Sequence, residues 1–295
     1  MDNVTHGLTG AGIGLLVSHE IMGVMADPAL VLTAIVASQL PDMDALVGAR
    51  DKTKYLKHHR GFMHSFFTAP VFAVGLAFVM SCFFDTSVAL MALTAFASLA
   101  LHIVLDVFNA YGTKALWPIS QERYAWDVLM VVDPMIIGMF SLGIFLYARG
   151  YQAMLYALYP ALMLYILSMV KHRVKAKKLL RSDLQPIKEN IDIMPPMVGW
   201  RRWNFIVLKD EKYYLGKINI AKKEMELQEI LDRPQSSRAV ESTKADPKVQ
   251  VFLDFARFPY YSMYQSQDGD MYVRWSDLRY KLREKEHFTL WSKTY

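Results

Sequence analysis

Runs of apolar residues long enough to cross a lipid bilayer constrain this chain more than any other feature. Within the first 170 residues they extend over 66–84, 88–105, 128–147 and 151–170. Each is close to the roughly 20 residues that a bilayer core demands of a helix. These runs mostly lack the polar stripe that a soluble helix shows at helical spacing. We therefore predict an α-helical membrane bundle in which the four runs are spanning helices.

Two earlier segments allow more than one interpretation. Residues 8–25 are interrupted by His19 and Glu20, and residues 28–40 are short. They could form short spans, a re-entrant pair or buried helices. Asp2 stands where a secretory signal peptide would carry its basic region, so the sequence predicts no such leader.

Charge separates the chain into two parts. Residues 1–170 hold 8 basic and 11 acidic side chains, whereas residues 171–295 hold 25 basic and 17 acidic ones. A chain of 295 residues is long enough for two domains. We expect a membrane-embedded helical domain over 1–170, a basic juxtamembrane linker over 171–198 and a cytoplasmic domain over 199–295.

The expected cytoplasmic domain is small and rich in β-strands. Residues 203–220 predict two strands joined by the turn KDEK, because aromatic and β-branched residues are enriched on both sides of it. Residues 221–233 could be a helix or a strand, and 233–248 predict a polar loop. Further strands are expected over 249–258, 260–267 and 271–280, with a tight turn at Gly269. No phosphate-binding glycine loop or nucleophile elbow is visible there, so we assign this domain to substrate access, regulation or partner binding.

Basic residues predict the orientation in the membrane. If both early segments cross, the N-terminus, the loops 41–62 and 106–127 and the tail after residue 170 share one side. That side carries most of the basic residues near the membrane, including those of KHRVKAKKLLR at 171–181 and Arg50, Lys52, Lys54, Lys57 and Arg60. Basic loops remain cytoplasmic, and the 171–181 run is expected to lie near anionic lipid headgroups.

Histidines and carboxylates gather on this same side. His102 and Asp106 are the most informative pair, because residues four apart on a helix share one face, with β-carbons roughly 5 to 6 Å apart. An imidazole and a carboxylate could there hold one cation, although a hydrogen bond between helices would explain the pair about as often. The other polar residues expected at this end are His6, Asp42, Asp44, His58, His59 and His64.

Considered together, these residues favour a metal site. The lone Cys82 excludes a zinc site made of several cysteines, so the ligands must be His, Asp or Glu. Mixed His and carboxylate ligation suits zinc, and also manganese or iron.

The motifs that carry these residues resemble one known family. In order over roughly residues 1–140 they are DNVTHGLTGAGIG, QLPDMD, HHRGFMHS, LHIVLDVFNAYGTKALWPIS and RYAWDVLMVVDP. The series is similar to the YdjM-type (DUF457) membrane-bound metal-dependent hydrolases, which implies a bacterial inner-membrane location. That family is in turn distantly similar to the zinc-dependent phospholipase C and P1 nuclease superfamily.

The resemblance implies a helical core that binds metal ions, which activate water against a phosphodiester. The ligands that it implies are His6, Asp42, Asp44, His59 or His64, His102 and Asp106. The superfamily pattern also has a histidine soon after the HxxxD element and a later HxxxE, and neither is present here. We therefore expect two metal ions rather than three.

Further roles follow from this chemistry. Asp42 or Asp44 is the candidate to bridge metals or to accept the proton of the attacking water. Arg60 could neutralise charge on a phosphate, or equally anchor at headgroups. Residues placed to line the substrate pocket are Asn109, Tyr111 and Thr113. Asp133, before Pro134, is expected to mark a helix boundary rather than to join the site.

Three functional classes remain at this point. The first is a phosphoesterase that acts on a phospholipid or another phosphorylated lipid at the cytoplasmic leaflet. The second is the same metal chemistry on a soluble or nucleic-acid substrate, for which the sequence offers no strong binding signal. The third is a membrane protein that binds a metal without catalysis. Ligands on one side of the membrane argue against transport, which would place its sites near the bilayer midplane.

Overall fold

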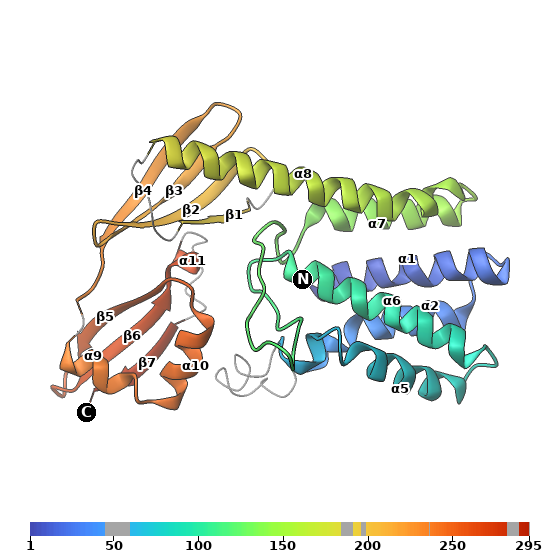
Figure 1. Cartoon of the computed structure of the whole chain (residues 1–295), viewed down its shortest axis with the longest axis horizontal. Coiled ribbons are helices and arrows are strands. Elements are labelled where there is room, and N and C mark those ends of the chain that lie inside the picture. Colours follow the sequence, from blue (N-terminus) through green and yellow to red (C-terminus); the bar gives the residue numbers. More distant parts are fainter. Residues whose placement is uncertain (45–59, 184–190, 196–198, 236, 282–288, 295) are drawn as a thin grey trace. The chain divides into compact units, whose positions relative to one another are not determined.

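The computed structural model describes residues 1–44, 60–183, 191–195, 199–235, 237–281 and 289–294. They form two compact units, a helical one up to Lys171 and a second that begins at His172 (Figure 1). The prediction of a helical N-terminal region followed by a β-rich region is thereby confirmed.

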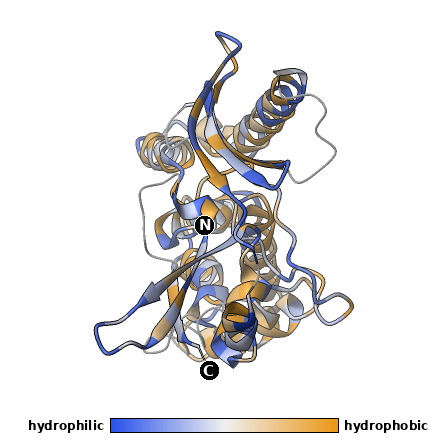
Figure 2. Ribbon diagram, turned by 90° about the vertical axis from the view of Figure 1, so that its left-hand side faces the viewer, coloured by the Kyte–Doolittle hydropathy of each residue, from blue (hydrophilic) through white to orange (hydrophobic). Residues whose placement is uncertain are grey.

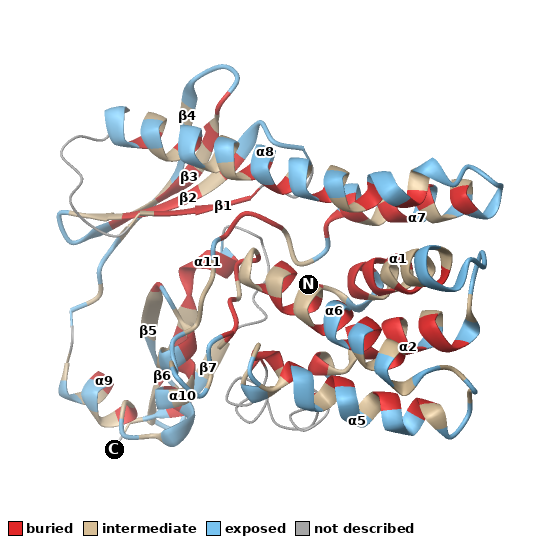
Figure 3. Cartoon of the chain, turned by 45° about the vertical axis from the view of Figure 1, so that its right-hand side comes forward, coloured by how far each residue is buried: buried red, intermediate tan, exposed pale blue. Residues whose placement is uncertain are grey.

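The N-terminal unit is a set of helices that pack side by side. Its helices and 3₁₀ turns are α1 (Asn3–Met22), α2 (Pro28–Gln39), η1 (Pro41–Met43), η2 (Phe62–His64), α5 (Ala69–Ser81), α6 (Val88–Val107), α7 (Pro134–Ala148) and the first part of α8 (Ala153–Asp183). Helices α1, α2, α5 and α6 lie side by side in Figures 1 and 3, and α1 contacts both α2 and α7.

Aspartates and prolines set where several of these helices begin. Asp2, Asp27 and Asp133 are the N-caps of α1, α2 and α7, and each accepts at least one backbone N–H of the first turn. Pro134 occupies the first turn of α7, where its missing N–H costs nothing. The structural interpretation of Asp133 is thus confirmed, and α7 begins at residue 134 rather than at 128.

Two of the four runs predicted to span lie in helices of spanning length. Among the described residues, Val88–Val107 and Ala153–Ser182 are long and apolar enough to cross a membrane. The runs 66–84 and 128–147 form the shorter apolar helices α5 and α7. Helix α5 starts only at Ala69 because residues 65–68 form turns, and Phe66 N donates to Ala115 O at 3.0 Å.

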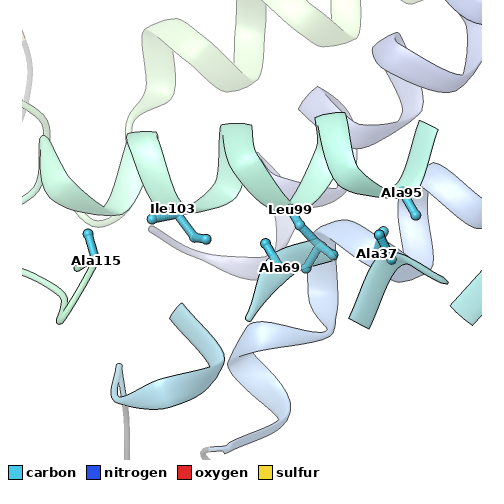
Figure 4. Close-up of a cluster of buried hydrophobic side chains, with 7 residues drawn as sticks. Ala37, Ala69, Ala95, Leu99, Ile103 and Ala115 are labelled. Atoms are coloured by element: carbon cyan, nitrogen blue, oxygen red, sulfur yellow. The ribbon is translucent and has the colours of Figure 1, made fainter. Parts of the chain in front are cut away.

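Small residues bring these helices into close contact. A β-carbon added at Gly14 would lie 2.6 Å from Val31 Cα, so only glycine allows this approach of α1 to α2. A cluster of short side chains around Leu99 and Ile103 joins α6 to α2 and α5 (Figure 4). Helix α5 buries its alanines and turns an apolar face outwards, which includes Val71, Val74, Phe78 and Val79 (Figure 3).

The C-terminal unit contains two antiparallel sheets. The four-stranded sheet has the order β1 (Ile191–Met194), β2 (Arg202–Lys209), β3 (Lys212–Asn219) and β4 (Glu224–Asp232). The last part of α8 packs on it, where Arg173 Nε donates to Ile193 O at 3.3 Å. Segment 171–183, part of the expected linker, therefore continues α8 as a helix. The positive φ angles of Asp210 and Glu211 suit the tight hairpin predicted at KDEK.

The three-stranded sheet carries short helices on one face. Its strands are β5 (Pro259–Gln265), β6 (Met271–Asp277) and β7 (Thr289–Lys293), and the helices on that face are α9 (Arg238–Thr243) and α10 (Pro247–Phe255). The short helix α11 (Leu278–Lys281) follows β6, and its Leu278 packs with Ile206 and Leu215 of the four-stranded sheet. Val273 and Trp275 of β6 pack against Val240, Val249 and Phe252 of the helices. Figure 2 shows hydrophilic residues concentrated on the hairpins and hydrophobic residues on the N-terminal helices.

Two predictions for this unit were wrong. Residues 249–258 were expected as a strand, but most of them form α10, because Val249, Phe252 and Phe255 recur every three residues and bury one helical face. The expected polar loop 233–248 contains α9, which Ser237 caps by accepting from Val240 N.

Candidate metal centre

Four side chains from three elements converge at one end of the N-terminal unit. Asp42 of η1, His64 of η2, and His102 and Asp106 of α6 each offer one ligand atom, and these atoms all lie within 4.8 Å of one another. Three of the four residues are fully buried, and Asp42 is partly exposed. The pairing of His102 with Asp106 on one face of a helix agrees with the expectation from their spacing.

Helix α6 presents His102 in a fixed tautomer. His102 Nδ1 lies 2.7 Å from the carbonyl oxygen of Ser38 in α2. Because a carbonyl only accepts, Nδ1 must donate, which leaves the lone pair of Nε2 for the cluster. That Nε2 lies 3.8 Å from Asp106 Oδ2 and 3.9 Å from Asp42 Oδ1. A carbonyl behind a histidine in this way is the usual support of a metal ligand.

A carboxylate supports His64 in a similar way. The Nδ1 of His64 lies 3.3 Å from Asp44 Oδ2. The Nε2 of His64 lies 3.3 Å from Asp42 Oδ1 and 3.5 Å from Asp106 Oδ2. Asp44 Oδ2 also accepts from Arg60 N at 2.9 Å. Asp44 is therefore placed behind His64, where it orients the ring, whereas Asp42 faces the other ligand atoms.

Asp42 is the one partly solvent-exposed side chain among the four candidate ligands. Its side chain is 11% exposed, against 0% for His64, His102 and Asp106. Burial favours a higher pKa for Asp42, but the hydrogen bond to His64 and the nearby imidazoles outweigh it and hold the pKa well below its ordinary value. Asp42 is thus an anion at neutral pH, which suits a metal ligand.

Arg60 lies beside the cluster in a strained backbone conformation. Its φ is +61°, in the left-handed region that bulky residues rarely adopt. Its N–H bond to Asp44 and the bond from Lys114 N to its carbonyl, at 3.1 Å, hold it there. The guanidinium donates to Asn109 Oδ1 at 2.8 Å, and its Nε lies 3.4 Å from Asp106 Oδ2.

The three residues expected to line a substrate pocket have different positions. Asn109 is buried and donates from Nδ2 to Asp106 Oδ1 at 2.9 Å. Thr113 is also buried, and its hydroxyl donates to His64 O at 3.4 Å. Both therefore support ligand residues from behind. Tyr111 is partly exposed, and its ring centroid lies 5.1 Å from the guanidinium carbon of Arg60.

His6 lies at the edge of the cluster. Its ring stacks on that of His102, with centroids 3.6 Å apart, and its Nε2 is 3.5 Å from Asp106 Oδ1. The amino group of Met1 contacts both His6 and Asp106. His59, also expected as a ligand, lies outside the described residues, as does His58.

The donor set fits a divalent cation. Within the described part of the chain, Asp42 Oδ2, Asp106 Oδ2 and His102 Nε2 are buried and have no hydrogen-bond partner. Buried polar atoms are rarely left so in native proteins. Acceptor atoms that converge in this way are mutually satisfied by a shared cation, and two histidines with two carboxylates suit zinc, manganese or iron.

Sequence reasoning missed the carbonyl that orients His102, and it assigned Asn109 to the substrate pocket rather than to the support of Asp106. The carbonyl of Ser38 fixes His102, and Asn109 connects Asp106 to Arg60. A main-chain carbonyl has no signature in the sequence, so only the packing of α2 on α6 reveals it. Asn109 did have a signal, because it stands three residues after Asp106, about one helical turn away.

Comparisons with known proteins match both parts of the chain. The YdjM inner membrane protein family matches residues 1–175, and the YfhP C-terminal alpha/beta plait domain matches residues 238–292. The chain is 28% identical to the uncharacterized protein YfhP of Bacillus subtilis (strain 168), over 98% of this chain and 89% of that one. No solved structure matches. None of these matches supports the expected similarity to phospholipase C and P1 nuclease. Since the first match covers more than half of the sequence, this chain belongs to the family of YdjM inner membrane proteins.

Proposed function

We propose that the N-terminal unit is a metal-dependent phosphoesterase that acts on a phospholipid or another phosphorylated lipid at the cytoplasmic leaflet. One observation carries the proposal: four ligand atoms converge within 4.8 Å, and the ligand residue that reaches solvent is a carboxylate. A site that only stabilised the fold would be closed, whereas a catalytic metal site keeps an open position.

Asp42, His64, His102 and Asp106 are the residues that would hold the metal, with zinc favoured and manganese or iron as alternatives. His6 and Asp44 are the nearest further donors, at Asp106 and behind His64. When bound, a divalent ion lowers the pKa of a coordinated water to about 7 and polarises a phosphoryl oxygen.

The protein's own side chains supply the remaining roles. Asp42, at the open edge of the cluster, can accept the proton of the attacking water. Arg60 carries the positive charge closest to Asp106 among the described arginines and lysines, and a guanidinium matches the geometry of phosphate oxygens. Tyr111, stacked under Arg60 and partly exposed, is the residue best placed to contact substrate.

The membrane topology belongs to the same proposal. We place the chain in a bacterial inner membrane as a multi-pass protein, with the metal centre and the C-terminal unit in the cytoplasm. The support is the family match, the two helices of spanning length and the basic residues on one side. Exposed Lys171, Lys175 and Lys178 share one face of α8, which suits anionic headgroups near the membrane surface.

The test is hydrolysis by the full chain in detergent micelles, loaded in turn with zinc, manganese and iron. The expected result is release of phosphate or a phosphorylated headgroup from a phospholipid panel, and its loss in Asp42→Asn and Asp106→Asn. Hydrolysis of single-stranded nucleic acid or a soluble diester, but not of lipid, would move the assignment to the soluble substrate class. Tight metal binding without hydrolysis of any phosphoester would contradict catalysis and indicate a non-catalytic metal-binding protein.

A further inference from the structure

Exposed apolar side chains lie on the turns that carry the metal ligands and on a segment hydrogen-bonded to them. They are Met43 in η1, Phe62 in η2, and Leu116 and Ile119 in the segment after α6, with exposed fractions of 50%, 49%, 39% and 75%. We refer to these four residues, together with Trp117, as the apolar collar. None of them lies on a long helix, so packing of spanning helices against lipid tails does not explain their exposure.

The collar is attached directly to the ligand-bearing segments. Met43 stands between Asp42 and Asp44, and Phe62 precedes His64 by two residues. The turns η1 and η2 contact each other, and the rings of Phe62 and Trp117 lie 6.1 Å apart. Backbone hydrogen bonds from Lys114 to Arg60 and from Phe66 to Ala115, at 3.1 and 3.0 Å, fasten the segment of Leu116 and Ile119 to that of His64. Apolar surface and metal ligands therefore share one rigid frame.

The position of the collar along the bundle identifies what covers it. Helix α6, of spanning length, ends at Val107 just before the segment that carries Leu116, Trp117 and Ile119. Phe62 lies just before α5, whose outward face is also apolar. The collar thus lies where a spanning helix leaves the hydrocarbon, the depth at which tryptophan and other amphipathic side chains concentrate. In water, a patch of this kind would be a liability.

We propose that the apolar collar inserts into the cytoplasmic face of the bilayer and holds the acyl chains of a phospholipid whose phosphoester reaches Asp42. The ligand class is an amphiphile with an anionic phosphate and long hydrocarbon chains. The catalytic half of this inference rests on the proposed phosphoesterase activity, whereas insertion of the collar does not depend on it.

Insertion can be measured without any activity. Cys82 is the sole cysteine, so Ile119→Cys and, as its control, Gln121→Cys can each be labelled with a fluorophore in a Cys82→Ser background. Both positions are exposed in the same segment. In nanodiscs that contain lipids spin-labelled on the acyl chain, we expect strong quenching at position 119 and weak quenching at 121. Equally weak quenching at both, or a label at 119 that is shielded in a detergent-purified dimer, would overturn the proposal.

The catalytic half has its own comparison. The probes are phosphatidylglycerol in mixed micelles and soluble bis(p-nitrophenyl) phosphate. The double variant Leu116→Ser, Ile119→Ser loses apolar contact with the acyl chains. We therefore expect its rate of lipid hydrolysis, divided by its rate of soluble-ester hydrolysis, to fall about tenfold. Ile21→Ser changes an isoleucine near the C-terminal end of α1 that is 63% exposed, against 75% for Ile119, and it should leave that ratio unchanged. An unchanged ratio in the collar variant would overturn acyl-chain binding. A wild type that hydrolyses neither probe would instead refute the proposed function. The fluorescence-quenching experiment would still decide whether the apolar collar inserts into the bilayer.

Discussion

The two units each bury charged side chains, but they satisfy them in opposite ways. In the C-terminal unit, Asp277 and Arg279 are buried together, with Arg279 Nε donating to Asp277 Oδ2 at 2.8 Å. In the N-terminal unit, the buried residues of the metal centre are two imidazoles and two carboxylates. Arg60 and the Met1 amino group lie beside Asp106, yet Asp42 Oδ2, Asp106 Oδ2 and His102 Nε2 have no hydrogen-bond partner among the described residues. The first cluster is satisfied as an ion pair, whereas the second keeps buried acceptor atoms that a bound cation would satisfy.

Details of the C-terminal cluster support this contrast. Asp277 also accepts from the backbone N–H groups of Arg257 and Arg279, and Arg257 Nη2 donates to Asp192 Oδ1 at 2.8 Å. Of the carboxylate oxygens in this network, only Asp192 Oδ2 lacks a hydrogen-bond partner among the described residues. Burial favours a lower pKa for Arg279, yet the charge of Asp277 outweighs it and raises that pKa above its ordinary value. The comparison shows that convergence of buried charge indicates a ligand where the neighbouring groups leave acceptor atoms without a hydrogen bond.

Removal of metal should affect one unit and spare the other. At a metal concentration about 1,000 times the Kd, binding contributes about 4 kcal/mol to the folded state. Chelation is therefore expected to accelerate amide exchange in η1, η2 and the end of α6 by up to about a thousandfold, with β5–β7 unchanged. Hydrogen exchange of the intact chain measures this acceleration. Equal acceleration in both units would show that the N-terminal unit is not specifically stabilised by metal.

Breaking the ion pair should affect the other unit. Arg279→Met leaves Asp277 buried without its guanidinium, which costs about 3 to 5 kcal/mol of unfolding free energy. The double variant with Asp277→Leu should recover much of that cost. Arg233→Met serves as the control, because its ion pair with Glu211 is exposed and contributes less than about 1 kcal/mol. Exchange of β6 amides gives the free energies, and similar losses for Arg279→Met and Arg233→Met would contradict a buried, mutually dependent pair.

Removal of a residue that orients a ligand should weaken metal binding less than removal of the ligand itself. Asp44→Asn removes the charge behind His64 Nδ1, and such changes typically weaken metal binding by about 10-fold to 100-fold. Asp85→Asn, at an exposed position beyond α5, is the matched control and should have no effect. Competition with a fluorescent chelator measures both affinities. A loss as complete as that of His102→Ala would show that Asp44 is itself a ligand.

The smallest effect is expected at a buried carboxylate that binds neither a metal nor an arginine. Burial raises the pKa of Asp133, only partly offset by the hydroxyl of Tyr165. A raised folded pKa gives stability that is present below the ordinary value of 3.8 and is lost as pH rises through the folded value. Asparagine in Asp133→Asn still caps the helix but does not titrate, so the variant does not lose this stability as pH rises. The Tm of Asp133→Asn minus the Tm of wild type should therefore increase by a few degrees from pH 4 to pH 8. If this difference in Tm decreased as pH rises, the raised pKa of Asp133 would be contradicted.

Sequence patterns predicted the features that depend on local spacing. The pair His102 and Asp106 follows from helical geometry, and the β2–β3 hairpin follows from its strand composition and turn. Residues 249–255 were misassigned because VQVFLDF fits both an alternating and a three-residue pattern, and the choice depends on packing against Val273 and Trp275. The helix within 128–147 was predicted too long because apolar content alone ignores the capping of α7 by Asp133.

The parts of the site that depend on tertiary contacts could not be predicted in the same way. Asp42 and Asp44 are separated by one residue and look equivalent in PDMD, yet one faces the ligand atoms and the other lies behind His64. That division follows from the 3₁₀ geometry of η1, where successive side chains point in different directions. The role of Ser38 depends on how α2 packs against α6, which no local pattern records.

The metal centre is tested most directly by the metal content of the purified full chain, measured by elemental analysis after brief supplementation with zinc, manganese and iron. His102→Ala is compared with wild type, and His172→Ala, a histidine of the other unit, is the control. We predict at least one tightly held divalent ion per chain in wild type and in His172→Ala, and its loss in His102→Ala. A well-folded wild type that retains no metal would contradict the presence of a metal centre.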